Sequence, residues 1–187
     1  FRNPPQERID EDILPSPYLT NVIWEFVDRS ESEKWAVNWE TNRGCPYGCT
    51  FCDWGAAVFN RTKRFSEEKL YKEIDWFAEN KLSFIECCDA NFGIFKQRDL
   101  EIARMIRSAA DRSRMDAINL QYNKNSTDEI FEIAKIVGPY SRGVTISVQS
   151  MNPETLKAIK RDNLDINDIS KLISISKTTG VSTYTEV

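Results

Sequence analysis

The spacing of apolar positions along this chain changes repeatedly between the alternation of a strand and the three- or four-residue period of an amphipathic helix. Strand-like runs occur at residues 34–40, 83–89, 116–122, 142–150 and 181–187. Helix-like runs lie between them, at residues 66–80, 98–113, 126–138, 152–161 and 166–180. Because strands and helices alternate, we expect an α/β fold whose parallel sheet has outer helices and right-handed crossovers.

End residues support several of these helices. Ser66 with two following glutamates is a good helix start, and Gly138 with Pro139 ends the helix predicted at 126–138. In the helix at 98–113 a set of apolar residues shares one side and is predicted to be buried. These residues are Leu100, Ile102, Ala103 and Ile106.

The chain divides into a short lead-in and one domain. Residues 1–18 are predicted to be a linker, because they are charged, contain four prolines and lack periodicity. Residues 19–187 are predicted to form a single core domain. The chain does not begin with methionine and its last predicted strand ends without a turn residue, so we expect a fragment whose core is incomplete at the C-terminus.

Composition narrows the class of protein. Apolar residues make up 41% and charged residues 29% of the 187 residues, an ordinary soluble balance, and no apolar run is long enough to cross a bilayer. The net charge of −4 makes a nucleic acid an unlikely partner, and the basic stretch at 60–64 is too short to change that. An odd number of cysteines, five, favours metal or redox chemistry in a reducing cytoplasm over disulfides.

Three of the five cysteines, Cys45, Cys49 and Cys52, lie within eight positions directly after the first predicted strand. A structural zinc site or a ferredoxin-type cluster needs four ligands, and the chain has no histidine. Cys87 and Cys88 are adjacent on a predicted strand, so they point to opposite faces and are expected to be ordinary buried thiols. Three thiolates leave one iron of a [4Fe–4S] cluster open to a reacting ligand, and this reading is preferred to zinc.

Two further polar stretches follow predicted strands, as the cysteines do. They are residues 88–93 (CDANFG) and residues 149–154 (QSMNPE). The carboxyl ends of parallel strands meet at one rim, where such folds place their active sites. The sequence therefore predicts a functional site formed by these three stretches.

The stretch "CPYGCTFC" resembles the C-x3-C-x2-C signature of the radical S-adenosylmethionine (radical SAM) enzymes. The resemblance implies a (β/α) barrel, here a partial one truncated at its fifth strand. It also implies a [4Fe–4S] cluster held by the three cysteines, with SAM on the open iron. In that family an electron from the cluster splits SAM into methionine and a 5′-deoxyadenosyl radical, which abstracts hydrogen from the substrate. A reductase, flavodoxin or ferredoxin is the implied electron donor.

Other segments extend the resemblance. "ILPSPYL" at 13–19 looks like the lead-in of a subgroup with an upstream cobalamin-binding domain, which implies cobalamin as a possible further cofactor. "DANFG" is similar to that subgroup's "DDNF" element, which implies that Asp89 and Asn91 approach the SAM amino group. The segment at 144–163 looks like the family's fourth strand and next helix, which implies that Gln149, Ser150 and Arg161 approach the SAM ribose and carboxylate. Phe51, between two cysteines, is placed to pack against adenine.

The leading hypothesis is thus a cytoplasmic radical SAM enzyme core, of the cobalamin-associated type, acting on a small molecule or a peptide. One alternative is a methylthiotransferase of the same superfamily that acts on RNA, which the acidic balance disfavours. The other is a zinc or iron–sulfur module without catalytic activity. Metal content separates the last from the first two, because about four irons per chain indicate the cluster and one zinc indicates the module.

Overall fold

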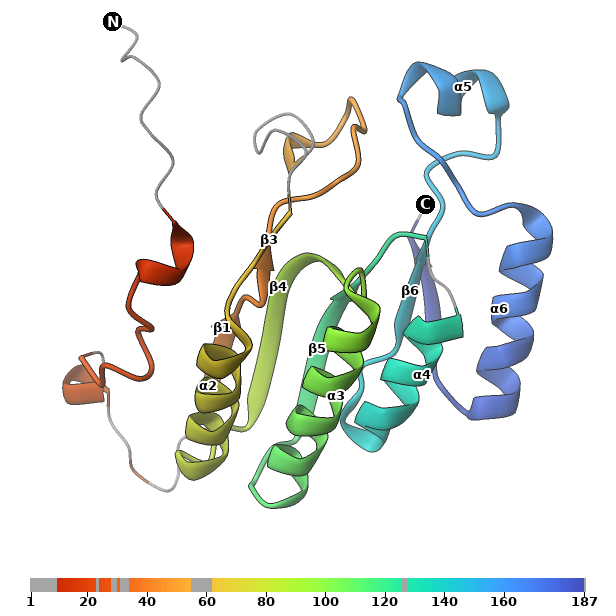
Figure 1. The fold of residues 1–187 in the computed structure, drawn as a ribbon. Coiled ribbons are helices and arrows are strands. Elements are labelled where there is room, and N and C mark those ends of the chain that lie inside the picture. The colour runs from red at the N-terminus through yellow and green to blue at the C-terminus, as the bar shows by residue number, and fades with distance from the viewer. Residues whose placement is uncertain are drawn as a thin grey trace, which may run out of the picture.

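Parallel strands and outer helices alternate along the chain (Figure 1). The computed structural model describes residues 10–22, 24–27, 30, 34–54, 62–125 and 128–186. The five strands expected from the sequence are β1 (Ala36–Trp39), β4 (Phe84–Phe92), β5 (Ala117–Tyr122), β6 (Val144–Ser147) and β7 (Thr183–Glu186). The helices between them are α2 (Glu67–Glu79), α3 (Lys96–Asp111), α4 (Asp128–Val137), α5 (Pro153–Ala158) and α6 (Ile166–Thr179). The predicted architecture is confirmed.

The strands form two parallel groups. One is a three-stranded sheet in the order β1-β4-β5, and the other is the pair β6-β7. A parallel bridge between Ile118 and Ser141 links the two groups, and the Arg142 amide donates to the Ile118 carbonyl at 3.2 Å. All five strands therefore point their carboxyl ends to one rim, the upper end in Figure 1.

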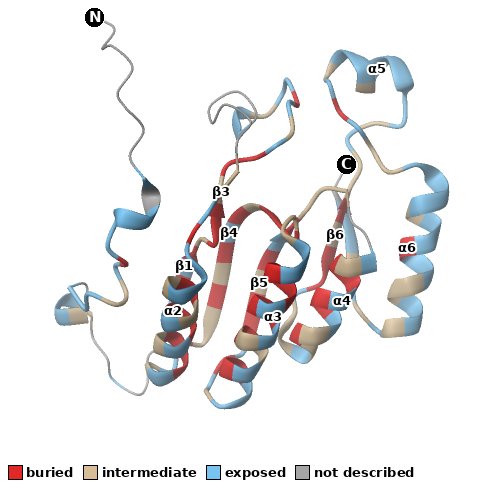
Figure 2. Cartoon of the chain, in the orientation of Figure 1, coloured by how far each residue is buried: buried red, intermediate tan, exposed pale blue. Residues whose placement is uncertain are grey.

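The core lies between the strands and the helices that cover them, where buried residues concentrate (Figure 2). Ser66 caps α2 as predicted, its hydroxyl accepting from the Lys69 amide. The predicted buried side of α3 is confirmed, since Leu100, Ile102, Ala103 and Ile106 are all buried. Gly138, with φ of 62°, ends α4 as expected and leads into the short helix η3 (Gly138–Tyr140).

The segment before the sheet packs along α2. It contains two short helices, η1 (Glu11–Ile13) and η2 (Trp24–Phe26). The Tyr18 ring contacts Phe77 edge-on at 5.0 Å, and the Trp24 ring stacks on Trp76 at 5.0 Å between centroids. The division into a linker at 1–18 and a core at 19–187 stays a prediction, and residues 1–9 lie outside the described part.

Some boundaries differ from those predicted from the sequence. Strand β4 continues through Phe92, past the predicted end at residue 89, so Asn91 lies in the strand and not in a loop after it. Strand β6 ends at Ser147, which leaves Gln149 and Ser150 in the following loop. A short antiparallel ribbon of β2 (Asn42–Arg43) and β3 (Lys63–Arg64) was not predicted. The first two residues of the helix predicted at 126–138, Ser126 and Thr127, lie outside the described residues.

One finding bears on membranes. Within the part of the chain that the structure describes, no helix combines the length and apolar character needed to span a bilayer.

Candidate functional site

The cysteine loop begins where β2 leaves the carboxyl end of β1. Gly44, with φ of 104°, turns the chain, in a conformation that favours glycine. Cys45 and Cys49 are buried, Cys52 is half-buried, and the Cys52 amide donates to the Cys49 carbonyl at 3.3 Å. The loop therefore turns back on itself with two of its three thiols enclosed by protein.

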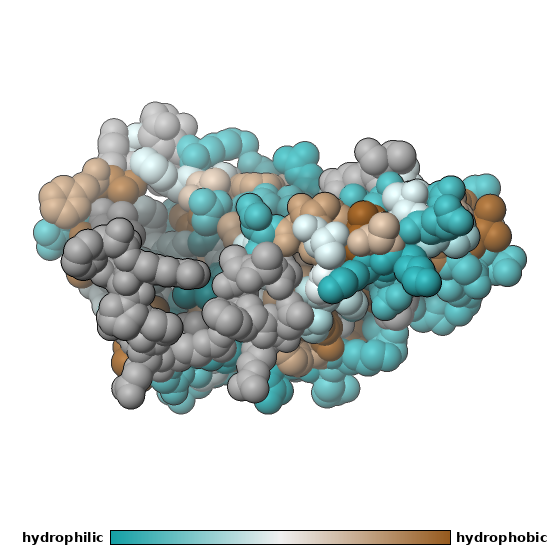
Figure 3. Space-filling model, turned by 90° about the horizontal axis from the view of Figure 1, so that it is seen from above, coloured by the Kyte–Doolittle hydropathy of each residue, from teal (hydrophilic) through white to brown (hydrophobic). Residues whose placement is uncertain are grey.

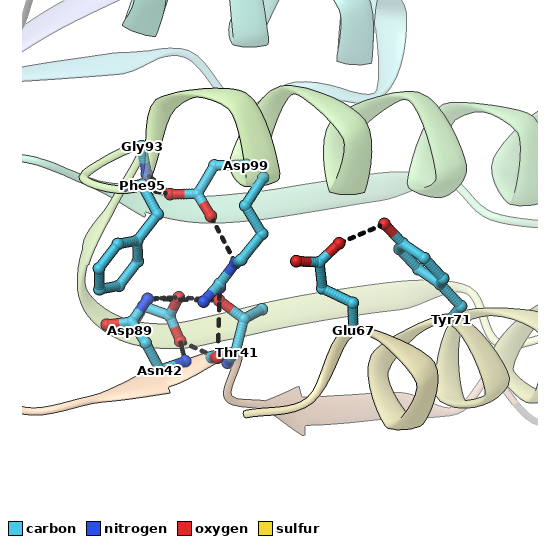
Figure 4. Close-up of polar contacts among 9 residues, drawn as sticks. Thr41, Asn42, Glu67, Tyr71, Asp89, Gly93, Phe95 and Asp99 are labelled. Carbon is cyan, nitrogen blue, oxygen red and sulfur yellow. Dashed lines mark hydrogen bonds and ion pairs between the residues drawn. The ribbon is translucent and has the colours of Figure 1, made fainter. Parts of the chain in front are cut away.

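Asp89 fixes the entry to this loop (Figure 4). Its carboxylate accepts hydrogen bonds from the amides of Thr41 at 2.6 Å and Asn42 at 3.2 Å, and from Asn42 Nδ2 at 2.6 Å. The Thr41 hydroxyl donates to Asp89 Oδ2, the oxygen that also accepts from Asn42 Nδ2. Burial raises the pKa of Asp89 to about 6, although these hydrogen bonds and the charge of Arg98 act in the opposite direction.

A second layer of polar contacts supports this one from α3 (Figure 4). Arg98 Nη2 donates to the Thr41 carbonyl at 3.2 Å and to its hydroxyl at 2.6 Å. Asp99 forms an ion pair with Arg98 at 3.0 Å and accepts from the amides of Gly93 and Phe95. Burial raises the pKa of Asp99, and the neighbouring guanidinium opposes that shift. The start of the cysteine loop is thus tied to both β4 and α3.

Asn91 reaches the first cysteine itself. It is fully buried, and its Nδ2 donates to Cys45 Sγ at 3.2 Å. Its Oδ1 is buried without a hydrogen-bond partner in the described structure. Asn91 is therefore placed at the sulfur of a predicted cluster ligand.

Arg161 lies on the other side of the loop. Its charged side chain is buried, since Arg161 is only 6% exposed. Its Nη2 donates to the Ser147 carbonyl at 2.8 Å and its Nε to Asn163 Oδ1 at 3.0 Å. These bonds hold the guanidinium at the carboxyl end of β6, so burial of the charge is offset by fixed acceptors.

A cleft of ≈ 140 Å³ joins Arg161 to the cysteine loop. It is lined by residues from three loops, namely Pro46, Tyr47, Gly48, Cys49, Lys124, Asn125, Lys160, Arg161 and Asp162. Two contacts hold these loops together. The Tyr47 hydroxyl donates to Asn123 Oδ1 at 2.8 Å, and the Thr50 amide donates to the Ile159 carbonyl at 3.0 Å. Three cationic side chains and one carboxylate, Asp162, line this cleft beside Cys49, and the excess of positive charge suits an anionic ligand group.

The remaining predicted site residues lie nearer to solvent. Phe51 is 51% exposed and Gln149 is exposed, while Ser150 is half-buried and accepts from the Asn152 amide through its hydroxyl. Cys87 is buried and Cys88 is exposed, as opposite faces of a strand require. The expectation that both are buried is wrong for Cys88, whose side of β4 is not covered by the helices.

Comparison with known proteins decides the family. The model of the radical SAM superfamily matches residues 39–185. This chain belongs to the radical SAM superfamily. The predicted resemblance is confirmed, and with it come the superfamily's cofactors, SAM and a [4Fe–4S] cluster.

Two curated relatives refine the placement of this radical SAM chain. One is the 2-(S-pantetheinyl)-carbapenam-3-carboxylate methyltransferase of Streptantibioticus cattleyicolor, 42% identical over 98% of the chain and 28% of that protein. The other is the cobalamin-dependent radical SAM methyltransferase TokK of Streptomyces tokunonensis, 39% identical over 92% of the chain and 26% of that protein. The chain thus spans less than a third of either relative.

The fold is shared with a solved structure, the radical SAM methyltransferase TsrM of Kitasatospora setae with tryptophan and a SAM analogue bound. It matches with a TM-score of 0.66 and 18% identity, over 81% of this chain and 30% of that one. This likeness supports a partial radical SAM core.

The donor set of this radical SAM chain fits a cubane better than a single ion. Among the described residues, no group of three or more Cys, His, Asp or Glu converges tightly enough to hold one metal ion. In a cubane each cysteine binds its own iron, so three sulfurs spread along a loop are suitable ligands. The amide of Asn91 donates toward Cys45 Sγ, which suits a thiolate, since a thiolate can only accept.

Sequence reasoning missed four residues that position the loop, namely Thr41, Asn42, Arg98 and Asp99. Each is buried and polar, at 6% exposure or less. Their partners are far away in the sequence, since Thr41 contacts Arg98, 57 residues later, and Asn42 contacts Asp89, 47 residues later. The only local signal was Arg98–Asp99 in the first turn of an amphipathic helix, where an acidic residue reads as an ordinary N-terminal charge.

Proposed function

We propose that this chain is the cluster- and SAM-binding part of a cobalamin-dependent radical SAM methyltransferase that acts on a small molecule or a peptide. The observation that carries the proposal is the three-cysteine loop at the carboxyl rim of the sheet, in a chain 42% and 39% identical to two methyltransferases. A cobalamin-holding domain upstream of the predicted linker at 1–18, and the substrate-binding remainder, belong to the same proposal.

Cys45, Cys49 and Cys52 are the proposed ligands of three irons. Burial of Cys45 and Cys49 limits access of water and oxidants to two of the three sulfurs. A cluster held by these cysteines would supply the electron for reductive cleavage of SAM into methionine and a 5′-deoxyadenosyl radical, the species proposed to abstract hydrogen from the substrate. A flavodoxin, ferredoxin or reductase is the proposed source of that electron.

The cleft beside Cys49 is the proposed seat of the SAM carboxylate. Arg161 is its strongest candidate partner, because the bonds to Ser147 and Asn163 hold the guanidinium in place before a ligand arrives. Gln149 and Ser150, in the loop after β6, are proposed to approach the ribose and carboxylate. Phe51 is proposed to pack on the adenine.

Asp89 and Asn91 remain proposed neighbours of the SAM amino group, and their contacts define what they contribute. Asp89 already accepts hydrogen bonds from Thr41 and Asn42, so its main contribution is to hold the loop entry in place. Asn91 still has a free, buried acceptor in Oδ1, which an ammonium group could satisfy.

Metal analysis after anaerobic reconstitution tests the proposal. We expect about four irons with matching sulfide per chain, and loss of most of this iron in Cys45→Ala, Cys49→Ala and Cys52→Ala. Cys88→Ala is the matched control, since Cys88 is exposed and distant in sequence from the loop. Binding of one zinc without sulfide, or equal iron loss in the control, would contradict the proposal.

Reaction products test the rest. With dithionite, the reconstituted full-length protein should convert SAM to methionine and 5′-deoxyadenosine. Expressed with hydroxocobalamin, it should retain a corrin absorption spectrum. Absence of the corrin spectrum would remove cobalamin from the proposal and leave the radical SAM assignment intact.

A further inference from the structure

The side chain of Asn91 donates a hydrogen bond to Cys45, the first of the three cysteines. The distance from Nδ2 to Sγ is 3.2 Å, and Asn91 has no exposed surface. Its Oδ1 has no partner, so the protein leaves one end of a buried amide unsatisfied while the other faces sulfur. An unsatisfied buried acceptor lowers the stability of the fold, whereas the donor end of the same amide can stabilise a thiolate ligand.

Both sides of this contact are held in place. On the strand side, the Asn123 amide donates to the Phe92 carbonyl at 2.8 Å and the Gly93 amide to Asp99 at 2.9 Å. On the loop side, Asp89 accepts from the amide of Asn42, three residues before Cys45. The distance between donor and sulfur is thus set before any cofactor binds.

The consequence is electrostatic. An N–H donor at a cluster thiolate draws negative charge away from sulfur, and the benefit is larger when the cluster carries one more electron. The donor therefore stabilises the reduced cluster relative to the oxidised one. In the step concerned, one electron leaves a reductant of the dithionite or flavodoxin type and takes the cluster from the 2+ to the 1+ state, with no bond formed or broken.

We propose that Asn91 sets the reduction potential of the cluster by donating this hydrogen bond to the Cys45 thiolate. It is a positioning residue that acts through Cys45, and this role is distinct from contact with SAM. The inference rests on the proposed function, because it needs a cluster on the three cysteines.

The test compares Asn91→Ala and Asn91→Asp with the wild type, each reconstituted anaerobically and titrated without SAM under EPR detection. Both variants should keep the wild-type iron content. In Asn91→Ala, the ratio of reduced to oxidised cluster at a fixed potential should fall about tenfold, which is 59 mV for one electron. Asn91→Asp should lower the reduction potential of the cluster further, because a carboxylate replaces the hydrogen-bond donor beside the sulfur.

Asn119→Ala is the matched control. Asn119 is half-buried on the neighbouring strand β5, and its side-chain amide donates to Glu86 Oε1 at 2.9 Å. The reduction potential of the cluster in Asn119→Ala should equal that in the wild type. An unchanged potential in both Asn91 variants, an equal shift in the control, or loss of the cluster from both Asn91 variants would overturn the inference. A wild type that binds no cluster would instead refute the proposed function.

Discussion

The buried carboxylate of Asp89 should make the stability of the cofactor-free protein depend on pH in a way that a single substitution removes. Asp89 is 1% exposed, and its pKa is raised to about 6 from 3.8 by burial. Since the folded state holds the proton more tightly than the unfolded state, stability falls as pH rises between these two values. Below pH 4 both states are protonated, and above pH 6 the whole loss is present.

The magnitude follows from the size of the shift. A difference of about two units at 1.36 kcal/mol per unit gives about 3 kcal/mol. Asp89→Asn cannot titrate, so the free energy of unfolding of this variant should gain about 3 kcal/mol on the wild type between pH 4 and pH 7. The variant should still fold. The Oδ1 of Asn42 is buried without a partner, and if the side-chain amide of Asn42 turns over, this oxygen can accept a hydrogen bond from the new amide at position 89.

Urea unfolding at pH 4, 5, 6 and 7 measures this difference, and every other titrating group cancels between the two proteins. Asp116→Asn is the control, the same chemical change at a carboxylate whose side chain is 57% exposed and paired with Lys34, and its effect should stay within about 0.5 kcal/mol. A difference that grows in favour of the wild type as pH rises would refute the reasoning. It would show that the hydrogen bonds from Thr41 and Asn42 outweigh burial.

Two further predictions concern SAM binding and packing. Arg161→Met should weaken SAM binding about ten- to a hundredfold, because one charge-assisted hydrogen bond contributes about 1.5–3 kcal/mol. The iron content should stay unchanged. Equilibrium dialysis measures the affinity for SAM, and Lys157→Met, at an exposed residue outside the cleft, is the control. Equal affinities would place the carboxylate elsewhere. Gly93→Ala should cost about 1–3 kcal/mol, because φ is +93° and the added Cβ would lie 2.2 Å from Ile130 Cδ1. Gly180→Ala, with φ of +71° and open space around it, should cost less, and thermal melts of equal midpoint for the two variants would contradict this account.

How far the sequence predicted this fold depends on the range of the interactions involved. The alternation of strand and helix patterns, the cap at Ser66 and the buried side of α3 are local features, and each was predicted correctly. The extension of β4 beyond residue 89 was not, because Asp89 and Asn91 are both of residue types that disfavour strands. They are accommodated there because Asp89 is bonded to Thr41 and Asn42, and Asn91 to Cys45, 46 to 48 residues earlier.

The candidate site shows the same limit. The spacing of Cys45, Cys49 and Cys52 indicated the superfamily without any structure, because the signature lies within eight residues. The burial of Arg161 was not predicted, since its acceptor is the Ser147 carbonyl, 14 positions earlier. The ribbon of β2 and β3 was missed for a different reason, because strands of two residues are too short to show an alternation of apolar and polar positions.

The bond from the Thr50 amide to the Ile159 carbonyl crosses between the two halves of the rim. Neither the cysteine loop nor the end of α5 can move away from the other without breaking this hydrogen bond, so the two segments should become ordered or disordered together. Opening of this region should therefore behave as one cooperative unit in hydrogen exchange. Protection of the Thr50 amide would then report how long the cleft between Cys49 and Arg161 stays assembled, with no cofactor bound.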